Sequence, residues 1–223
     1  MLLKNHRVLQ IKPEETHLWL TQKHYAKRVP NIMYAFGLYK LNNLVGVITY
    51  GKPASNSLCI GVCGKDNAKY VIELNRLCLL NNNRNEASYF IGKSLKLLLK
   101  PKIVVSYADT SMNHNGYIYQ ATNFIYTGLS DKRTEWRVIG SNKHSKTITE
   151  QSTLKERKEQ TDKYEVVERP RKHRYIFFVA DKKTKKLFNS QLNYKILSYP
   201  KNITKKYDSG DRVNSQLIMS LTW

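Results

Sequence analysis

The stretch IVVSYADTSMNHNGYIYQATNFIYTG, residues 103–128, joins a buried strand to a polar turn and then to a helical pattern. Its opening β-branched run, Ile103–Val105, predicts a strand with both faces covered. After the polar turn, apolar side chains recur at helical spacing from Gly116, and Gly128 is a typical helix stop. Open α/β sheets place their sites at the carboxyl ends of such strands, so we expect Asp109 to lie in a functional site. An N-cap or turn role is the alternative for this carboxylate.

Net charge is the most unusual property of the composition. The 223 residues include 38 Lys and Arg against 17 Asp and Glu, which gives a net charge of +21 and a pI near 9.8. The excess is spread along the chain: residues 1–139 carry 19 basic and 8 acidic side chains, and residues 173–223 carry 10 and 3. A folded protein this basic indicates a polyanionic partner, first nucleic acid and then an anionic membrane surface. A basic surface without a specific partner is the alternative.

Length and apolar content favour one soluble domain, or a core domain with an appendage. No apolar run reaches the ~18 residues of a membrane-spanning helix, and no signal peptide opens the chain, so we expect an intracellular protein. Cys59, Cys63 and Cys78 agree with a reducing compartment. Because no second Cys/His pair follows at zinc-ribbon spacing, we interpret all three as small buried apolar side chains.

Strand and helix patterns alternate before the opening stretch. Asn42–Asn43, a dipeptide that tolerates positive φ, predicts a hairpin turn. Further on, Glu73 and Arg76 are charged groups within an apolar run, which is unfavourable unless they are paired or functional. A salt bridge of Glu73 is one interpretation, and a site role for Arg76 is the other. Periodicity and turn residues predict strands at 6–12, 33–41, 44–50 and 70–80, helices at 13–27 and 86–100, and a polar loop at 53–68.

The pattern changes after the opening stretch. Residues 132–139 predict a further strand, and residues 173–179 an apolar one. Between them, residues 140–172 are rich in Ser, Thr, Lys, Glu and Gln, which predicts a mobile excursion or a long hairpin insertion. In the basic tail, residues 192–197 have apolar side chains that suit a short docked helix. The chain thus divides into a core at 1–139, a polar insertion at 140–172, and a final core strand with a basic extension at 173–223.

The order of strands and helices is that of the GNAT acyltransferase fold, a mixed sheet with helices on both faces. A more specific resemblance lies in the wording of five segments: FGLYKLNNLVGVITYGKPAS at 36–55, ELNRLCL at 73–79, SYADTSMNHNGYIYQATNFIYTG at 106–128, KRTEW at 132–136 and PRKHRYIFF at 170–178. Together these segments resemble the Mom family of bacteriophage DNA-modification proteins, and the resemblance covers roughly Arg7 to Pro200.

The resemblance implies an α/β (α+β) GNAT-like fold and a DNA-modifying transferase of the host cytoplasm. It implies that adenine N6 in phage DNA is converted to a carbamoylmethyl (glycinamide-like) derivative, which protects the phage genome from host restriction. The implied partners are double-stranded DNA and a small-molecule group donor, with no membrane. Two alternatives stay open: a non-catalytic basic DNA-binding protein on a GNAT-like scaffold, and a GNAT acyltransferase that acts on another substrate.

One segment departs from ordinary GNAT enzymes, which bind the CoA pyrophosphate at a glycine-rich turn before a helix. Here the turn, residues 81–88, has no glycine. Arg84 and Ser88 can hold an anion at this helix N-terminus, while Glu86 opposes it. The donor is therefore open between an acyl-CoA and another glycine- or acetamide-type molecule. The iron that the resemblance also implies has Asp109, His114 and His24 as candidate ligands.

Modification of adenine requires particular groups because its exocyclic amine is a poor nucleophile. The base must leave the stack, a group must accept a proton, and donors must stabilise charge on the electrophile. We expect Asp109 to orient the amine or accept its proton, tyrosines to stack on the base, and amide or imidazole groups to read its N6/N7 edge. The candidates are, for catalysis, Asp109, Tyr107, Ser106 and Arg76; for adenine, Asn113, His114, Tyr117, Tyr119 and Gln120; and for phosphates, Lys132, Arg133, His173, Arg174 and the lysines of 182–186. Ordinary packing for the tyrosines and a solvated surface for the cations are the alternatives.

Overall fold

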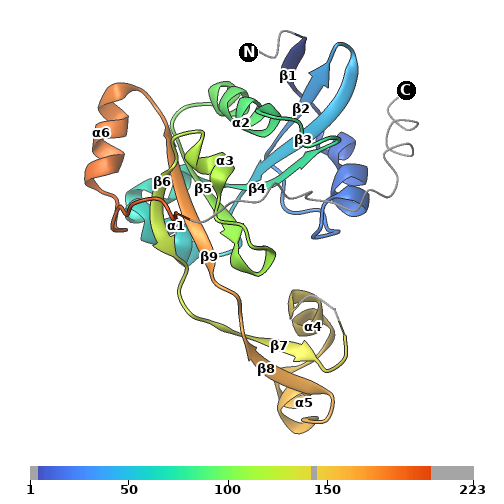
Figure 1. The fold of residues 1–223 in the computed structure, drawn as a ribbon. Coiled ribbons are helices and arrows are strands. Elements are labelled where there is room, and N and C mark those ends of the chain that lie inside the picture. Colours follow the sequence, from blue (N-terminus) through green and yellow to red (C-terminus); the bar gives the residue numbers. More distant parts are fainter. Residues whose placement is uncertain (1–4, 142–144, 202–223) are drawn as a thin grey trace.

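The computed structural model describes residues 5–141 and 145–201, and it consists of two parts (Figure 1). The larger part, here called the body, is a seven-stranded sheet with the strand order β1-β2-β3-β4-β5-β9-β6. The smaller part, here called the lobe, comprises residues 131–170. Figure 1 shows the lobe joined to the body through the ends of β6 and β9.

The first four strands form an antiparallel meander. In the tight turn between the second and third strands, Leu41 has the positive φ, 56°. The sequence predicts this conformation one residue later, at Asn42–Asn43. The strands are β1 (His6–Gln10), β2 (Tyr34–Lys40), β3 (Asn43–Gly51) and β4 (Val71–Leu79), and they confirm the four strands that the sequence predicts.

The pairing of β4 with β5 (Lys102–Asp109) creates the opening in which the site lies. These parallel strands pair only at Val71–Glu73 against Ile103–Val105, although both strands continue beyond. They therefore splay apart after Glu73 and Val105. On the far side of β5 come β9 (Lys172–Val179), paired with β5 along its whole length, and then β6 (Ile125–Leu129).

Each face of the sheet has its own helices and its own hydrophobic cluster. On one face, α2 (Glu86–Leu97) and the single turn α3 (Tyr117–Gln120) pack on a cluster that includes Ile72 and Val104. On the other face, α1 (Asn56–Cys63) and α6 (Lys182–Ser190) pack on a cluster that includes Ile103 and Phe178. The expected fold class, a mixed sheet with helices on both faces, is confirmed.

Two helices lie where the sequence predicts none. The expected loop at 53–68 contains α1, which begins after Ser55, whose hydroxyl accepts from the Leu58 amide at 3.3 Å. In the basic tail the helix is α6 and does not lie at 192–197, because Asp181 caps α6 by accepting from the Thr184 amide at 3.0 Å. Both N-caps are of the type that starts helices most often.

Two other predicted helices are shorter than expected. The helical pattern from Gly116 ends at Gln120, since Asn123 takes a positive φ of 61° and the β-branched and aromatic residues after it join the sheet as β6. The helix expected at 13–27 consists of two separate turns, a 3₁₀ turn at Pro13–Thr16 and a π turn at Trp19–Lys23.

The lobe is built on a two-stranded antiparallel sheet, β7 (Thr134–Val138) with β8 (Tyr164–Glu168). Two short helices, α4 (Ser145–Gln151) and α5 (Leu154–Glu159), connect the strands, and the Arg157 guanidinium of α5 lies 5.8 Å from the Trp136 ring centroid. The strand predicted at 132–139 is therefore present, but it pairs inside the lobe. The excursion from the main sheet begins before residue 140 for this reason.

The three cysteines are buried, as the sequence indicates. Cys59 and Cys63 belong to the cluster under α1, and Cys78 belongs to a third cluster beside Trp19. Within the described residues, none of the helices has the length and apolar character needed to cross a membrane.

Candidate active site

Two adjoining cavities lie where β4 and β5 splay apart. The smaller, of about 160 Å³, is bounded by residues 73–77 of β4, by His24 and Tyr25, and by Lys172. The larger, of about 640 Å³, lies between the N-terminus of α2 and residues 114–121. The cavities share part of their walls: Asn82, Ala87, Tyr107, His114, Ile118 and Tyr119. Two binding spaces thus meet at one set of side chains.

Ser106 closes the point at which the strands separate. It follows the last paired residue of β5, and its fully buried hydroxyl donates to the Leu74 carbonyl at 2.9 Å. Leu74 is the first β4 residue without a β5 partner, so the hydroxyl replaces a missing hydrogen bond of the sheet. Ser106 lines neither cavity. The predicted catalytic role is corrected to a structural one.

Arg76 lines the smaller cavity from β4. Its Nη1 donates to the Asn75 carbonyl at 2.7 Å, while its buried Nε has no hydrogen-bond partner among the residues described. Burial lowers the pKa of the guanidinium, opposed by Tyr25 and Glu73, but an arginine stays charged in proteins. A guanidinium that lines a cavity is suited to bind a carbonyl or anionic oxygen there. This placement agrees with the site role predicted for Arg76.

His24 and Tyr25 enter the smaller cavity from the end of the Trp19–Lys23 turn. Burial, together with the nearby charge of Arg76, lowers the pKa of His24 to about 3, so its imidazole is neutral. His24 Nδ1 accepts from the Ala26 amide at 3.1 Å, which places the proton on Nε2. The imidazole also stacks on Tyr25, with 4.4 Å between ring centroids. His24 is therefore a neutral hydrogen-bond donor in a fixed orientation.

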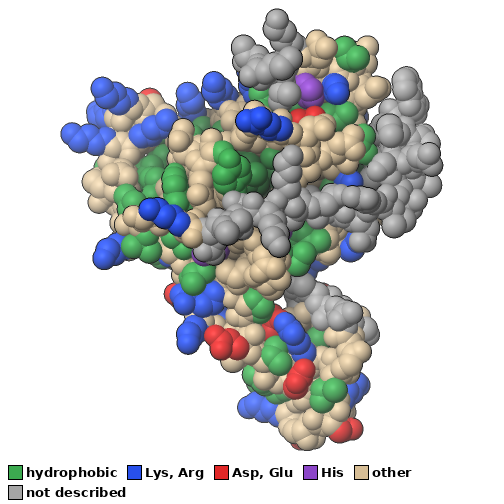
Figure 2. Space-filling view, in the orientation of Figure 1, with side chains coloured by type: hydrophobic (Ala, Val, Ile, Leu, Met, Phe, Trp, Pro, Cys, Tyr) green, Lys and Arg blue, Asp and Glu red, His purple; other side chains and the backbone are tan. Residues whose placement is uncertain are grey.

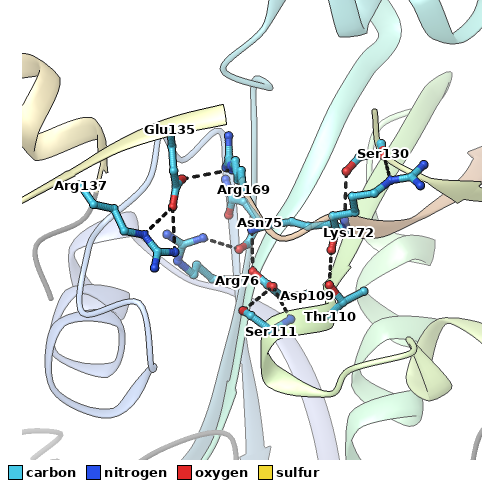
Figure 3. Close-up of polar contacts among 11 residues, drawn as sticks. Asn75, Arg76, Asp109, Thr110, Ser111, Ser130, Glu135, Arg137, Arg169 and Lys172 are labelled. Atoms are coloured by element: carbon cyan, nitrogen blue, oxygen red, sulfur yellow. Dashed lines mark hydrogen bonds and ion pairs between the residues drawn. The ribbon is translucent and has the colours of Figure 1, made fainter. Parts of the chain in front are cut away.

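Asp109 ends β5 and lines neither cavity. One carboxylate oxygen accepts from the amide and the hydroxyl of Ser111, at 3.0 and 2.7 Å, as the N-cap of the turn Thr110–Met112. The other oxygen accepts from the Lys172 ammonium at 2.9 Å (Figure 3). Burial alone would raise the pKa of this carboxyl, but Lys172 and Ser111 hold it below its ordinary value. The N-cap alternative is observed, and a lowered pKa makes Asp109 a weak proton acceptor.

The three tyrosines predicted for the site differ in their surroundings. Tyr107 lines both cavities, and burial raises the pKa of its phenol, which therefore stays protonated. Tyr119 also lines both, but it is 7% exposed and packs on Tyr175 with 5.2 Å between ring centroids. Tyr117 lines the larger cavity and is 63% exposed. Tyr107 is the best placed to contact a ligand, and Tyr119 is a wall that also belongs to the core.

The three polar residues expected to contact the edge of adenine also differ in their positions relative to the cavities. His114 lines both cavities, and burial lowers its pKa against the opposing charge of Asp109. Asn113 takes a positive φ of 54° after the Thr110–Met112 turn and lines neither cavity. Gln120 donates its amide to the Asn115 carbonyl at 3.1 Å and to the Tyr175 hydroxyl at 3.2 Å, so it is held inside the protein. His114 is the one of the three that is placed to contact a ligand.

The predicted phosphate contacts lie outside the two cavities. Lys132 and Arg133 are exposed at the start of the lobe, and His173 Nδ1 hydrogen-bonds the Tyr126 hydroxyl at 2.8 Å. Arg174 is 8% exposed, because its Nε donates to Thr127 Oγ1 at 2.9 Å and its guanidinium lies 3.3 Å from the Tyr194 ring centroid. The phosphate contact predicted for Arg174 is therefore wrong, since the protein encloses its charge.

Arg84 and Ser88 line the larger cavity at the N-terminus of α2, as expected. The buried Glu86 carboxylate accepts from Asn83 Nδ2 at 2.9 Å and lies 3.2 Å from His6 Nε2. A carboxylate in this position already balances the positive end of the helix dipole. The residues here are therefore a poor fit to a diphosphate group such as that of CoA.

In residues 5–141 and 145–201, no three His, Cys, Asp or Glu side chains are grouped closely enough to hold a metal ion. The ligands expected for iron, Asp109, His114 and His24, form no such group. The residues present thus do not fit the iron that the family resemblance implies.

The chain matches the family model of the Mom protein family over residues 5–201. The chain belongs to the Mom protein family. A relative in this family, the methylcarbamoylase mom of Escherichia phage Mu, is 32% identical over 211 residues, which cover 86% of this chain and 84% of that protein. The family resemblance expected from the sequence segments is confirmed.

Solved structures that resemble this Mom-family chain include N-acetyltransferases. One from Staphylococcus aureus Mu50 is 12% identical with a TM-score of 0.44, over 78% of this chain and 99% of that one. The ribosomal-protein-S5-alanine acetyltransferase of Vibrio fischeri is 8% identical with a TM-score of 0.45, over 79% and 94%. The Salmonella typhimurium protein yncA, solved with acetyl-CoA, is 8% identical with a TM-score of 0.44, over 79% and 95%. These similarities concern the fold alone.

Several residues of the smaller cavity are not predicted for the site from the sequence of this Mom-family chain, among them Tyr25, Glu73, Asn75 and Lys172. For Glu73 and Asn75 a usable signal exists, because polar side chains inside an apolar strand are unfavourable unless they face a partner or a cavity. For Tyr25 and Lys172 we find none, since each reaches the cavity through the tertiary arrangement of distant segments.

Proposed function

We propose that this Mom-family chain is a transferase that modifies adenine in DNA. It converts the N6 amine to a carbamoylmethyl (glycinamide-like) derivative and thereby protects phage DNA from restriction inside the host cell. The observation that carries this proposal is the pair of cavities that share Tyr107, His114 and Tyr119. A transfer reaction needs two ligands held so that their reacting atoms meet. A protein that only binds DNA needs neither cavity.

The smaller cavity suits the adenine base. Enzymes that act on a base in duplex DNA flip it into a pocket, stack it on aromatic rings and hydrogen-bond its edge. Tyr25 and Tyr107 supply rings, and neutral His24 supplies a hydrogen-bond donor. Arg76 supplies a guanidinium for the carbonyl oxygen of the transferred group.

The larger cavity suits the small-molecule donor, either an acyl-CoA type or a glycine- or acetamide-type molecule. The poor fit to a diphosphate at α2 favours the second of these. The donor's reactive group then approaches adenine N6 at the wall that the two cavities share, beside Tyr107 and His114. Arg84 and Ser88 contact the part of the donor nearest α2.

The distribution of charge favours DNA binding by the body. Outside the lobe the chain has 28 Lys and Arg against 9 Asp and Glu, whereas residues 131–170 have 10 and 8. Figure 2 shows lysine and arginine side chains spread over the body, with most of the acidic side chains of that face on the lobe. The lysines of α6 are exposed as well: Lys182, Lys183, Lys185 and Lys186. Because phosphate contacts supply most non-specific affinity for DNA, we expect the duplex to lie on the body.

Mass spectrometry of nucleosides from cells that express the protein tests this function. We expect a modified deoxyadenosine heavier by one carbamoylmethyl group, and DNA that resists restriction enzymes whose sites contain adenine. Unmodified nucleosides in cells with folded, soluble protein would contradict the proposal and favour the non-catalytic DNA-binding alternative. A modified protein or metabolite, with unmodified DNA, would favour an acyltransferase that acts on another substrate.

Deleting the lobe, residues 131–170, and bridging the gap with a short Gly-Ser linker is expected to leave the body folded. The two ends are already adjacent, because the Ser130 amide donates to the Lys172 carbonyl at 2.8 Å and the Lys172 amide donates to Ser130 Oγ at 3.0 Å. DNA affinity is expected to fall by less than about tenfold and to keep a steep negative slope of log K against log salt, since the body keeps most of the net charge.

DNA binding at several salt concentrations measures this slope, and a thermal melt of the shortened chain controls for folding. Loss of cooperative unfolding would show that the body depends on the lobe. A deletion variant whose DNA affinity no longer depends on salt would show that the lobe makes the phosphate contacts.

A further inference from the structure

We propose that Glu73 accepts the proton of adenine N6, the role that the sequence suggests for Asp109. The inference rests on the proposed function and names the group that carries its central proton transfer. It follows from the position of Glu73 in the sheet, from its lack of partners and from the chemistry of its neighbours.

Glu73 stands at the point where β4 and β5 separate. It is the last β4 residue with a β5 partner, opposite Val105, and it lines the smaller cavity together with Arg76, Tyr107 and Lys172. A residue at this position is fixed by the paired part of the sheet and yet faces the opening beyond it. The paired backbone of β4 therefore holds Glu73 at the edge of the cavity.

The partners of the two candidate carboxylates differ sharply. The Asp109 carboxylate accepts from the Ser111 amide, the Ser111 hydroxyl and the Lys172 ammonium. For Glu73, the described part of the chain contains no hydrogen bond or ion pair to the carboxylate. The salt bridge that the sequence suggests for Glu73 is thus absent from the residues described, and its oxygens are available to a ligand in the cavity.

The surroundings of Glu73 favour a proton acceptor near neutral pH. Burial raises the pKa of its carboxyl, and the charges of Arg76 on β4 and Lys172 on β9 oppose this shift without cancelling it. Two neutral groups also face it, the Tyr107 phenol on β5 and the Cys59 thiol of α1. General bases act best when their pKa lies near the working pH, and a raised carboxyl pKa moves Glu73 in that direction.

The proton transfer completes a substitution at the adenine amine. The N6 lone pair forms a bond to the methylene carbon of a carbamoylmethyl donor, and the bond from that carbon to the leaving group breaks with its electron pair. The N6–H bond breaks as well, and its proton passes to a Glu73 carboxylate oxygen. The Arg76 guanidinium lines the same cavity and is the cation available to the carbonyl oxygen of the transferred group.

The test compares the wild type with Glu73→Gln and Glu73→Asp in permeabilised cells buffered between about pH 5 and about pH 9. This range covers the acid limb of the pH–rate profile, in which the rate falls as the pH is lowered. Modified deoxyadenosine formed per unit time is measured by nucleoside mass spectrometry. In the wild type, the rate should fall as pH drops through the raised pKa of Glu73, because only the deprotonated carboxylate accepts a proton. Glu73→Gln should lower the rate by about 10²–10⁴-fold and remove this acid limb. Glu73→Asp should restore a measurable rate together with an acid limb.

Thermal melts of each variant show whether a lost rate reflects unfolding, and Gln keeps the size of Glu while removing the buried charge. A Glu73→Gln variant that modifies DNA with an unchanged acid limb would overturn the inference. So would Asp109→Asn if it alone removed the acid limb, because Asp109 would then be the acceptor. A wild type that modifies no adenine at any pH would refute the proposed function itself, and the two failures are therefore distinguishable.

Discussion

Changing Arg76 to alanine is expected to lower the rate of adenine modification by about 10²-fold, the usual loss when a contact that positions the reacting group is removed. The guanidinium lines the smaller cavity with a buried Nε–H that has no hydrogen-bond partner among the residues described. Its removal also leaves Glu73 without its nearest cation on β4, which should raise the pKa of Glu73 further and move the acid limb of the rate to higher pH.

Arg76→Lys separates charge from geometry at this position. Lysine keeps the positive charge but loses the planar fork of donors, so we expect most of the rate loss to persist and the shift of the acid limb to be smaller. Arg137→Ala is the matched control, since Arg137 lies in the lobe and its exposed pair with Glu135 contributes under about 1 kcal/mol. Nucleoside mass spectrometry gives the rates, and melts give the folding. An Arg76→Ala rate within about threefold of the wild type would contradict the role assigned to Arg76.

Gly116→Ala is expected to lower the free energy of unfolding by about 2–5 kcal/mol, because strain and overpacking add at this position. Gly116 has a positive φ of 77°, and a Cβ there would lie against the Tyr175 ring well inside van der Waals contact. The buried Tyr175 cannot easily move, since its hydroxyl donates to the Asn115 carbonyl and accepts from Gln120. Modification should fall too, because α3 forms the wall that carries Ile118 and Tyr119.

Gly92→Ala is the matched control for Gly116→Ala. Gly92 lies inside α2 with open space where a Cβ would be, so alanine should stabilise the protein by about 0.5–1 kcal/mol through helix propensity. Chemical denaturation of both variants gives the two free energies. A loss below about 1 kcal/mol for Gly116→Ala would mean that Tyr175 and the α3 turn adapt to a side chain, and that this wall is less rigid than described.

The strands of the body are readable from the sequence because their apolar runs and turns carry a local signal. The helix α1 is harder to predict from the sequence. It has a short apolar face after Ser55, and Gly61 and Gly64 are residues more typical of a loop. Residues after Gln120 keep a helical spacing of apolar side chains, but pairing with β9 makes them a strand. Hydrophobic spacing alone cannot decide between these outcomes, because tertiary contacts override local preference.

The site is only partly readable for a different reason. Arg76 is predicted as a charged group within an apolar run and Tyr107 as an aromatic residue after a buried one, and both line the smaller cavity. The separation of β4 from β5 leaves no mark in either strand's own sequence, so the polar signal at Glu73 does not distinguish a cavity from an ion-pair partner. The structural role of Ser106 is equally hidden from the sequence. Its buried hydroxyl donates to the Leu74 carbonyl, which lacks a sheet partner only because the two strands separate.

The central claim is that adenine enters the cavity between the splayed strands, and the structure of the Glu73→Gln variant bound to a short adenine-containing duplex tests it most directly. This variant should bind DNA and stall before transfer. We predict an adenine flipped out of the stack, with its ring against Tyr107 or Tyr25 and its N6 within hydrogen-bond distance of the residue 73 side chain. An adenine that stays stacked in the duplex, or a flipped base held at Asp109 or on the lobe, would contradict this account.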